Sequence, residues 1–153
     1  AQNKIQNINA LYFNFKDYLK NGERGQTPYT PAVTIMLQLE ARLKQIKDRG
    51  GVTQSIANEK EVANYFRENI KALPLKESTP YLPNAMTALT PDDGKSAMAI
   101  VNALEENYKV VVCPNGGAER DSIFRVSHMG EMSKEYTDIL INALYDYYGM
   151  ARA

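Results

Sequence analysis

The stretch Ser122–Tyr148, SIFRVSHMGEMSKEYTDILINALYDYY, places one arginine in a short apolar strand directly before a strongly patterned helix. The strand is predicted from the β-forming residues Ile123, Phe124 and Val126, which surround Arg125. A guanidinium in so apolar a strand needs a partner, and its planar fork suits a carboxylate, so Arg125 is a candidate carboxylate-binding residue. From the residues alone, an internal pair with Asp or Glu, or a side chain that reaches solvent, is the commoner arrangement.

The helix that follows is marked at both ends. Ser133 is its expected N-cap and Gly149 the residue that ends it. Apolar residues recur between them at helical spacing, which predicts one buried face. That face comprises Met132, Tyr136, Ile139, Leu140, Ala143, Leu144 and Tyr147.

The composition is that of an ordinary globular domain, with 153 residues, 44% of them hydrophobic and 24% charged. Eighteen basic residues balance eighteen acidic ones, so nucleic-acid binding is not expected. A single cysteine and a single histidine argue against a disulfide and a conventional zinc site, so we expect no metal and a reducing, cytoplasmic location. No signal peptide and no apolar run of membrane-spanning length is present, and the chain begins with Ala1 rather than methionine.

The first third of the chain is predicted to hold two helical segments joined by a loop. Residues 1–11 look like an extended lead-in, and Leu11–Leu19, LYFNFKDYL, looks like a short amphipathic helix. In Arg24–Val33, RGQTPYTPAV, we expect an extended loop in which Thr30 caps a helix and Pro31 is its first residue. A hydroxyl-rich loop at a helix N-terminus can hold an anion, and a purely structural cap is the alternative. The helix should run to about residue 48 and carry on one face Ala32, Ile35, Met36, Leu39, Leu43 and Ile46.

The remaining elements are predicted from hydrophobic periodicity. A helix at about 53–72 should be followed by strands at 75–77 and 84–89, a helix that starts at Thr90–Asp93, and a hairpin of strands 110–113 and 123–126. The first of these helices should face inward with Ile56, Ala63, Phe66, Ile70 and Leu73, and outward with Glu59, Lys60, Glu61, Arg67 and Glu68. This order predicts an α+β two-layer sandwich, a small, mostly antiparallel sheet with helices packed on one side.

The residues offer no reaction centre. Cys113 has no base beside it and is interpreted as a buried, inert thiol, and His128 as a structural hydrogen-bonding residue. Gly94-Lys95-Ser96 imitates the end of a phosphate-binding loop, but the required earlier glycine is Leu89.

Four stretches taken together resemble a known family. They are LYFNFKDYL, RGQTPYTPAV, VVVCPNGGAERDSIFRVSHMG and the C-terminal amphipathic helix. In order and spacing they are similar to the C-terminal small domain of class V, fold-type I pyridoxal-phosphate-dependent aminotransferases. The branch that they resemble contains the alanine-glyoxylate, serine-glyoxylate and serine-pyruvate enzymes.

The resemblance implies roles for particular residues. Arg125 matches the arginine that binds the α-carboxylate of the amino-acid or keto-acid substrate. The Gln26-Thr27 pair resembles the segment that reaches across a homodimer to the cofactor phosphate of the other subunit, with Thr30 as a second candidate hydroxyl. Gly116 and Gly117 match a turn near the site.

The resemblance also implies that a large part of the enzyme is missing. The lysine that carries the cofactor, its aspartate partner and the glycine-rich cofactor loop would lie in an absent large domain that mainly binds the pyridoxal phosphate. Residues 1–27 would be the lead-in and interdomain segment, and 28–153 the long interdomain helix plus the small domain. Alone, this chain should not transfer an amino group between alanine or serine and glyoxylate or pyruvate. The alternatives are a free-standing carboxylate-binding or regulatory module, and a phosphonate-amine transaminase or cysteine desulfurase of the same fold.

Overall fold

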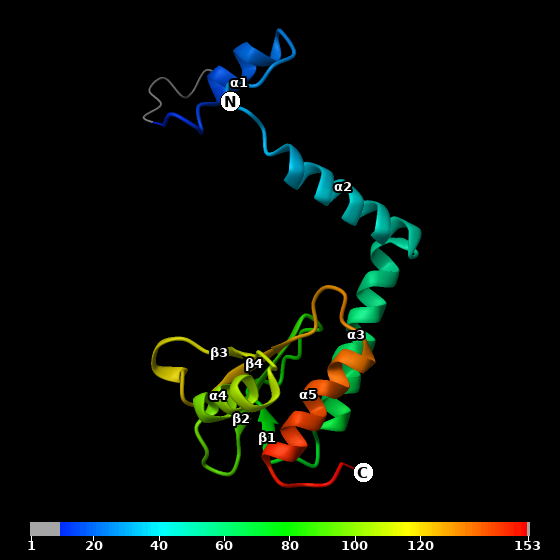
Figure 1. Cartoon of the computed structure of the whole chain (residues 1–153), viewed down its shortest axis with the longest axis vertical. Coiled ribbons are helices and arrows are strands. Elements are labelled where there is room, and N and C mark those ends of the chain that lie inside the picture. Colours follow the sequence, from blue (N-terminus) through cyan, green and yellow to red (C-terminus); the bar gives the residue numbers. More distant parts are fainter. Residues whose placement is uncertain (1–9, 153) are drawn as a thin grey trace. The chain divides into compact units, whose positions relative to one another are not determined.

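The computed structural model describes residues 10–152, and most of the predicted lead-in lies outside them. Within the chain there are two compact units, the first ending at Asp48 and the second beginning at Arg49 (Figure 1).

The first unit contains helix α1 (Phe15–Gly22) and helix α2 (Val33–Asp48). Asn14 caps α1, since its side chain accepts a hydrogen bond from the Lys16 amide at 3.2 Å. The aromatic segment folds back on the loop, because the rings of Tyr12 and Tyr29 stack with centroids 5.2 Å apart. The Tyr29 hydroxyl also donates to the Leu11 carbonyl at 3.0 Å.

One prediction about α2 is wrong. The helix begins at Val33 rather than Pro31, and its first carbonyl acceptor is Ala32, which takes a hydrogen bond from Met36 N, so Thr30 is not the cap. The apolar face predicted for this helix does form, and it is exposed, because α2 has no buried residue at all. Amphipathic spacing shows that a face is suited to burial, but the described part of the chain offers nothing that covers this one. Its exposed apolar residues include Ile35, Met36, Leu39 and Leu43.

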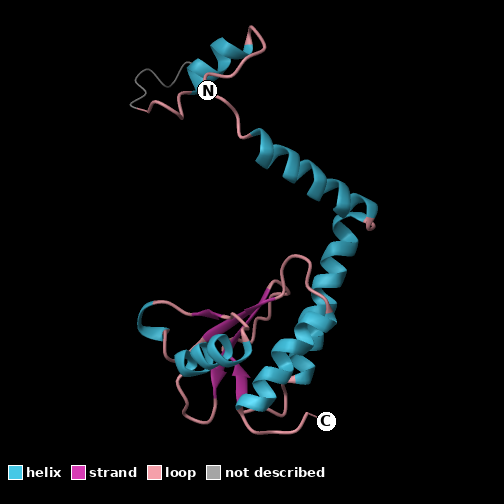
Figure 2. Ribbon diagram, viewed as in Figure 1, coloured by secondary structure: helices cyan, strands magenta, loops and turns pink. Residues whose placement is uncertain are grey.

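The second unit has the predicted order of elements (Figure 2). It runs α3 (Gly51–Asn69), β1 (Leu75–Glu77), β2 (Met86–Pro91), α4 (Ala97–Tyr108), β3 (Cys113–Pro114), the short 3-10 helix η2 (Gly117–Glu119), β4 (Phe124–Ser127) and α5 (Lys134–Tyr147). Ser133 caps α5 by accepting from the Tyr136 amide, and Gly149 after it adopts φ +63°, so both predicted ends of this helix are confirmed.

The four strands form one antiparallel sheet in the order β1-β2-β4-β3. Burial alternates along β2 and β4, because successive side chains of a strand point to opposite faces. One face carries Leu89 opposite Phe124, and both are fully buried against α3, α4 and α5. The two-layer α+β prediction, with helices on one side, is therefore confirmed.

Apolar side chains from all three helices and the two central strands meet in this core. Its fully buried members include Phe66, Leu89, Ile100, Leu104, Phe124, Ile141 and Leu144. Burial of this kind stabilises a domain by roughly 25 cal/mol for each Å² of apolar surface removed from water. The core holds β4, and with it Arg125, in a fixed position.

Several local predictions differ from the structure. Residues 110–112 are not a strand, although the hairpin of β3 and β4 does form. Thr90 and Pro91 belong to β2, where Pro91 ends the strand opposite Leu75, and Ser96 caps α4 instead. Proline is compatible with a strand end as well as with a helix start, so the sequence pattern did not separate the two.

Some predicted burial is also wrong. Ile56, Tyr136 and Ile139 are more than half exposed, whereas Arg67, predicted to face outward, is only 7% exposed. None of the helices within residues 10–152 is long and apolar enough to span a membrane.

Candidate carboxylate-binding site on β4

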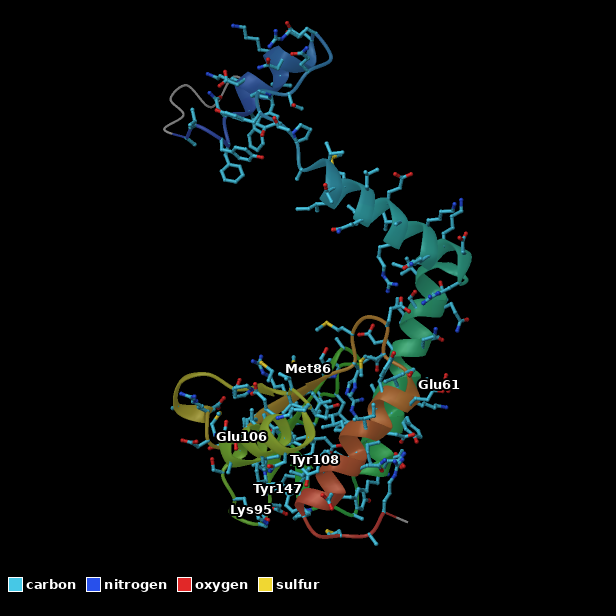
Figure 3. The ribbon with its side chains drawn as sticks, viewed as in Figure 1. Glu61, Met86, Lys95, Glu106, Tyr108 and Tyr147 are labelled. Carbon is cyan, nitrogen blue, oxygen red and sulfur yellow. The ribbon has the colours of Figure 1, made fainter. Side chains whose placement is uncertain are left out.

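Arg125 lies on the sheet face that the helices leave uncovered. Its neighbours Phe124 and Val126 are buried on the helix side, so strand alternation directs Arg125 to the opposite side. Across the sheet, Arg125 is paired with Ala88 of β2 and with Cys113 of β3. Met86, which is labelled in Figure 3, is the first residue of β2 and lies two residues before Ala88.

The guanidinium of Arg125 is held by β3. Its Nη2 donates to the Cys113 sulfur at 3.1 Å and to the Pro114 carbonyl at 3.1 Å. Its Nε is buried and has no hydrogen-bond partner among the residues that the structure describes. No ion pair within residues 10–152 involves Arg125, so the internal Arg–carboxylate pair considered above does not form there. Buried donors in folded proteins normally have a partner, so this Nε is suited to bind an acceptor on a ligand.

The Cys113 prediction needs correction, because the cysteine is exposed rather than buried. β3 is only two residues long and lies at the edge of the sheet, so no neighbouring strand covers it on its far side. The thiol therefore lies at the surface beside the guanidinium of Arg125.

A buried polar cluster fixes the two strands that carry the site. Arg67 of α3 donates from Nε to the Thr87 hydroxyl at 3.0 Å and from Nη2 to the carbonyls of Pro83 and Met86, at 2.5 and 3.3 Å. The Thr87 hydroxyl also bonds to His128 Nε2 at 2.7 Å. The cluster thus joins α3, the start of β2 and the residue that follows β4.

His128 is structural, as predicted. It is 2% exposed, its ring lies against Phe66, and its amide donates to the Ala85 carbonyl at 2.9 Å. Burial, together with the charge of Arg67, lowers the pKa of His128 to about 4, so the imidazole is neutral at pH 7. Burial likewise lowers the pKa of Arg67, with Glu77 opposing the change.

Sequence reasoning missed Arg67, although a signal was present. Arg67 follows Ala63 by four residues, so the two share a helix face, and Ala63 is fully buried. The run of charges around it favoured an outward assignment. The neighbouring Glu61 does follow that pattern and pairs with Lys134 at the start of α5 (Figure 3).

The loop proposed to contact a phosphate presents exposed donors. Gln26, Thr27 and Thr30 are all exposed. The Thr27 hydroxyl donates to the Tyr29 carbonyl at 2.7 Å, and the backbone N–H of Gln26 donates to the Asn21 carbonyl at 3.0 Å. These contacts give the loop a defined shape within the first unit.

The turn before β4 begins with Gly117, the first residue of η2, at φ +61°, a backbone conformation that suits glycine.

No group of three or more His, Cys, Asp or Glu side chains that could hold a metal ion occurs in the part of the chain that the structure describes.

Comparison with known proteins gives aminotransferases as relatives, although no family model matches the chain. An uncharacterized aminotransferase of Helicobacter pylori is 29% identical over 147 residues, which cover 94% of this chain and 38% of that protein. The serine–glyoxylate aminotransferase of Hyphomicrobium methylovorum is 23% identical over 137 residues, covering 86% of this chain and 34% of that protein.

The fold is also that of an aminotransferase. The crystal structure of alanine–glyoxylate aminotransferase from Nostoc sp. superimposes with a TM-score of 0.77 and 22% identity, over 88% of this chain and 36% of that one. The chain is therefore homologous to aminotransferases, shares the fold of a part of them, and spans about a third of the length of the relatives that it matches. The alternatives of a free-standing module, a phosphonate-amine transaminase and a cysteine desulfurase are not favoured.

Proposed function

We propose that this chain is the C-terminal domain of a class V aminotransferase that uses pyridoxal phosphate. The complete enzyme would move an amino group between alanine or serine and a 2-oxo acid such as glyoxylate or pyruvate. The proposal rests on the surroundings of Arg125, which lies on the open sheet face of an aminotransferase fold. Among residues 10–152 its guanidinium has no carboxylate partner, and its Nε is buried without a hydrogen-bond partner.

Arg125 would bind the α-carboxylate of both substrates in turn. A planar guanidinium can grip a carboxylate with two parallel hydrogen bonds, which fixes both the position and the orientation of the substrate. The cluster of Arg67, Thr87 and His128 fixes β2 and the end of β4, the strand that carries Arg125. A fixed carboxylate presents the same α-carbon to the reacting groups at each turnover, which lowers the entropic part of the barrier.

The loop before α2 fits the phosphate of the cofactor. Thr27, Gln26 and Thr30 are exposed hydrogen-bond donors at the approach to a helix N-terminus, where anions are favoured. The Thr27 hydroxyl has one hydrogen, which it now gives to the Tyr29 carbonyl, so contact with a phosphate requires that bond to be exchanged. When bound, pyridoxal phosphate supplies the electron sink that lets an amino acid lose its α-proton and exchange its amino group.

Further proposals concern the whole protein. Residues 1–27 would form the lead-in and interdomain segment, and 28–153 the interdomain helix and small domain, with most of the cofactor contacts in a separate large domain. We place the enzyme in the cytoplasm as a homodimer in which the Gln26–Thr30 loop reaches the partner's cofactor. This chain alone, without a cofactor-carrying lysine, would be inactive.

Steady-state kinetics of the full-length enzyme test this assignment. Arg125→Ala should raise KM for both the amino acid and the keto acid by about 100-fold, because a charged hydrogen-bonded pair is lost. Arg125→Lys should recover little, since an ammonium cannot form the fork. Arg120→Ala is the matched control, because Arg120 is exposed in the preceding turn and makes no side-chain hydrogen bond with the described residues. Unchanged KM values in Arg125→Ala would contradict the role of this arginine.

A further inference from the structure

The two hydrogens of Arg125 Nη2 are both engaged. A guanidinium has five N–H donors, two on each terminal nitrogen and one on Nε. Nη2 gives one to the Cys113 sulfur and one to the Pro114 carbonyl, both at 3.1 Å. The Arg125 side chain is therefore held against β3 by two hydrogen bonds from a single nitrogen.

This arrangement bears directly on how a carboxylate can bind. A bidentate carboxylate uses either the two terminal nitrogens or the pair of Nε and Nη2. Both forks include Nη2, so neither can form while both of its hydrogens are engaged. A carboxylate that docks in a bidentate manner must displace Cys113 or Pro114.

Of the two partners, the thiol is the weaker. A thiol sulfur is a poor acceptor, whereas the Pro114 carbonyl is a strong one and is fixed in the backbone of β3. Cys113 is also exposed, so its side chain can turn away into solvent. Loss of the sulfur contact therefore costs less than loss of the carbonyl contact.

A second observation favours the fork of Nε and Nη2. Nε is buried with no partner in the described residues, which is an unfavourable state for a donor. A carboxylate bound along this edge would satisfy Nε and replace the sulfur on Nη2 in one step. The Pro114 carbonyl would continue to anchor the guanidinium.

We propose that Cys113 latches Arg125 in the substrate-free site and is displaced by the substrate carboxylate, so that the side chain at position 113 sets the affinity for the acid. This inference rests on the proposed function, which supplies the carboxylate. It makes Cys113 a positioning residue that acts through Arg125, with no covalent step of its own.

The test is a series of substitutions at position 113 in the full-length protein. The dissociation constant of pyruvate, measured by isothermal titration calorimetry without an amino donor, is the first readout, and KM with kcat is the second. Cys113→Ala removes the competing acceptor and should tighten pyruvate about twofold to threefold. Cys113→Ser offers a stronger acceptor and should weaken it by a similar factor, while Cys113→Asp should weaken it about 100-fold through a charged pair with Arg125.

The order Ala, Cys, Ser, Asp from tightest to weakest, with kcat changed by less than about twofold, is the expected result. Val111→Asp is the control, because it adds the same charge at an exposed position two residues earlier. If Cys113→Ala weakens binding and Cys113→Ser restores it, the thiol supports Arg125 rather than competing, and the proposal is wrong. Equal constants across the series would overturn it as well.

Failure of the proposed function would look different. A wild-type protein that binds pyruvate but transfers no amino group would refute the transaminase assignment. The order of dissociation constants among the position-113 variants would still test whether Cys113 competes with the carboxylate for Arg125. A wild-type protein that transfers the amino group but shows no such order would refute only the latch. A wild-type protein that does not bind pyruvate would overturn both.

Discussion

The Thr87 hydroxyl bonds to both Arg67 and His128, the two buried polar residues next to the site. Its removal should therefore lower the free energy of unfolding strongly. The hydroxyl accepts from Arg67 Nε at 3.0 Å and bonds to His128 Nε2 at 2.7 Å. Thr87 is fully buried, and its partners are 7% and 2% exposed, so water cannot replace it in either bond. Thr87→Val keeps the shape of the side chain and leaves both groups unpaired.

The cost follows from those two groups. An unsatisfied buried donor or acceptor costs about 1–3 kcal/mol, and more when it is charged, so the sum for Thr87→Val is about 4 kcal/mol. Thr87→Ser keeps the hydroxyl and loses one buried methyl group, which costs about 1 kcal/mol. The comparison of the two variants therefore isolates the hydrogen bonds from the packing.

Equilibrium urea unfolding, followed by circular dichroism, measures the difference. With an m value of about 1.5 kcal/mol/M, Thr87→Val should lower the unfolding midpoint by about 2–3 M, and Thr87→Ser by less than about 1 M. Thr90→Val is the control in the same strand, because it breaks only an exposed hydroxyl contact with Ser78 (2.8 Å), which water can replace, so it should stay close to the wild type. Equal midpoints for the Val and Ser variants at position 87 would refute the reasoning that the hydroxyl unites the cluster.

Three further predictions concern other parts of the chain. The pKa of His128 is about 4 in the folded protein and 6.5 in the unfolded chain, so the unfolded chain binds more protons between these two pH values. The free energy of unfolding should therefore fall by up to about 3 kcal/mol as the pH drops from 6.5 to 4. In urea unfolding measured across that range, His128→Gln should remove this pH dependence. Arg152→Ala should lower the free energy of unfolding by about 1 kcal/mol, because Arg152 pairs with Asp138 at 2.6 Å between α5 and the C-terminal residues; a loss no larger than that of Arg120→Ala would count against the pair. Leu39→Glu combined with Leu43→Lys should reduce self-association of this chain in sedimentation velocity, because both side chains are exposed on the apolar face of α2; unchanged association would show that another surface is responsible.

Much of the fold could be predicted from the sequence because its signals are local. The order of helices and strands follows from hydrophobic periodicity, and the ends of α5 follow from Ser133 and Gly149. Which face of a helix is covered is a tertiary property. That is why Ile139 is exposed and Arg67 is buried against expectation. The apolar face of α2 could be predicted from its spacing, whereas the surface that would cover it could not.

The candidate site was predictable only in part. Arg125 stands out because a guanidinium in an apolar strand needs an acceptor. Its contact with Cys113 could not be predicted, because it depends on the register of β3 against β4, which a strand of two residues does not reveal. The cluster behind the site escaped notice for a similar reason, since Arg67 and His128 are far apart in the sequence and meet only through Thr87.

The central claim is that the chain is part of a transaminase, and one measurement tests it most directly. The full-length protein, expressed from its own gene and purified without added cofactor, is titrated with L-alanine while its visible absorbance and the release of pyruvate are followed. We expect a visible pyridoxal absorbance that disappears as about one equivalent of pyruvate forms, and that returns when glyoxylate is added. A protein with no visible absorbance, even after incubation with pyridoxal phosphate, and no pyruvate release from alanine or serine would contradict it.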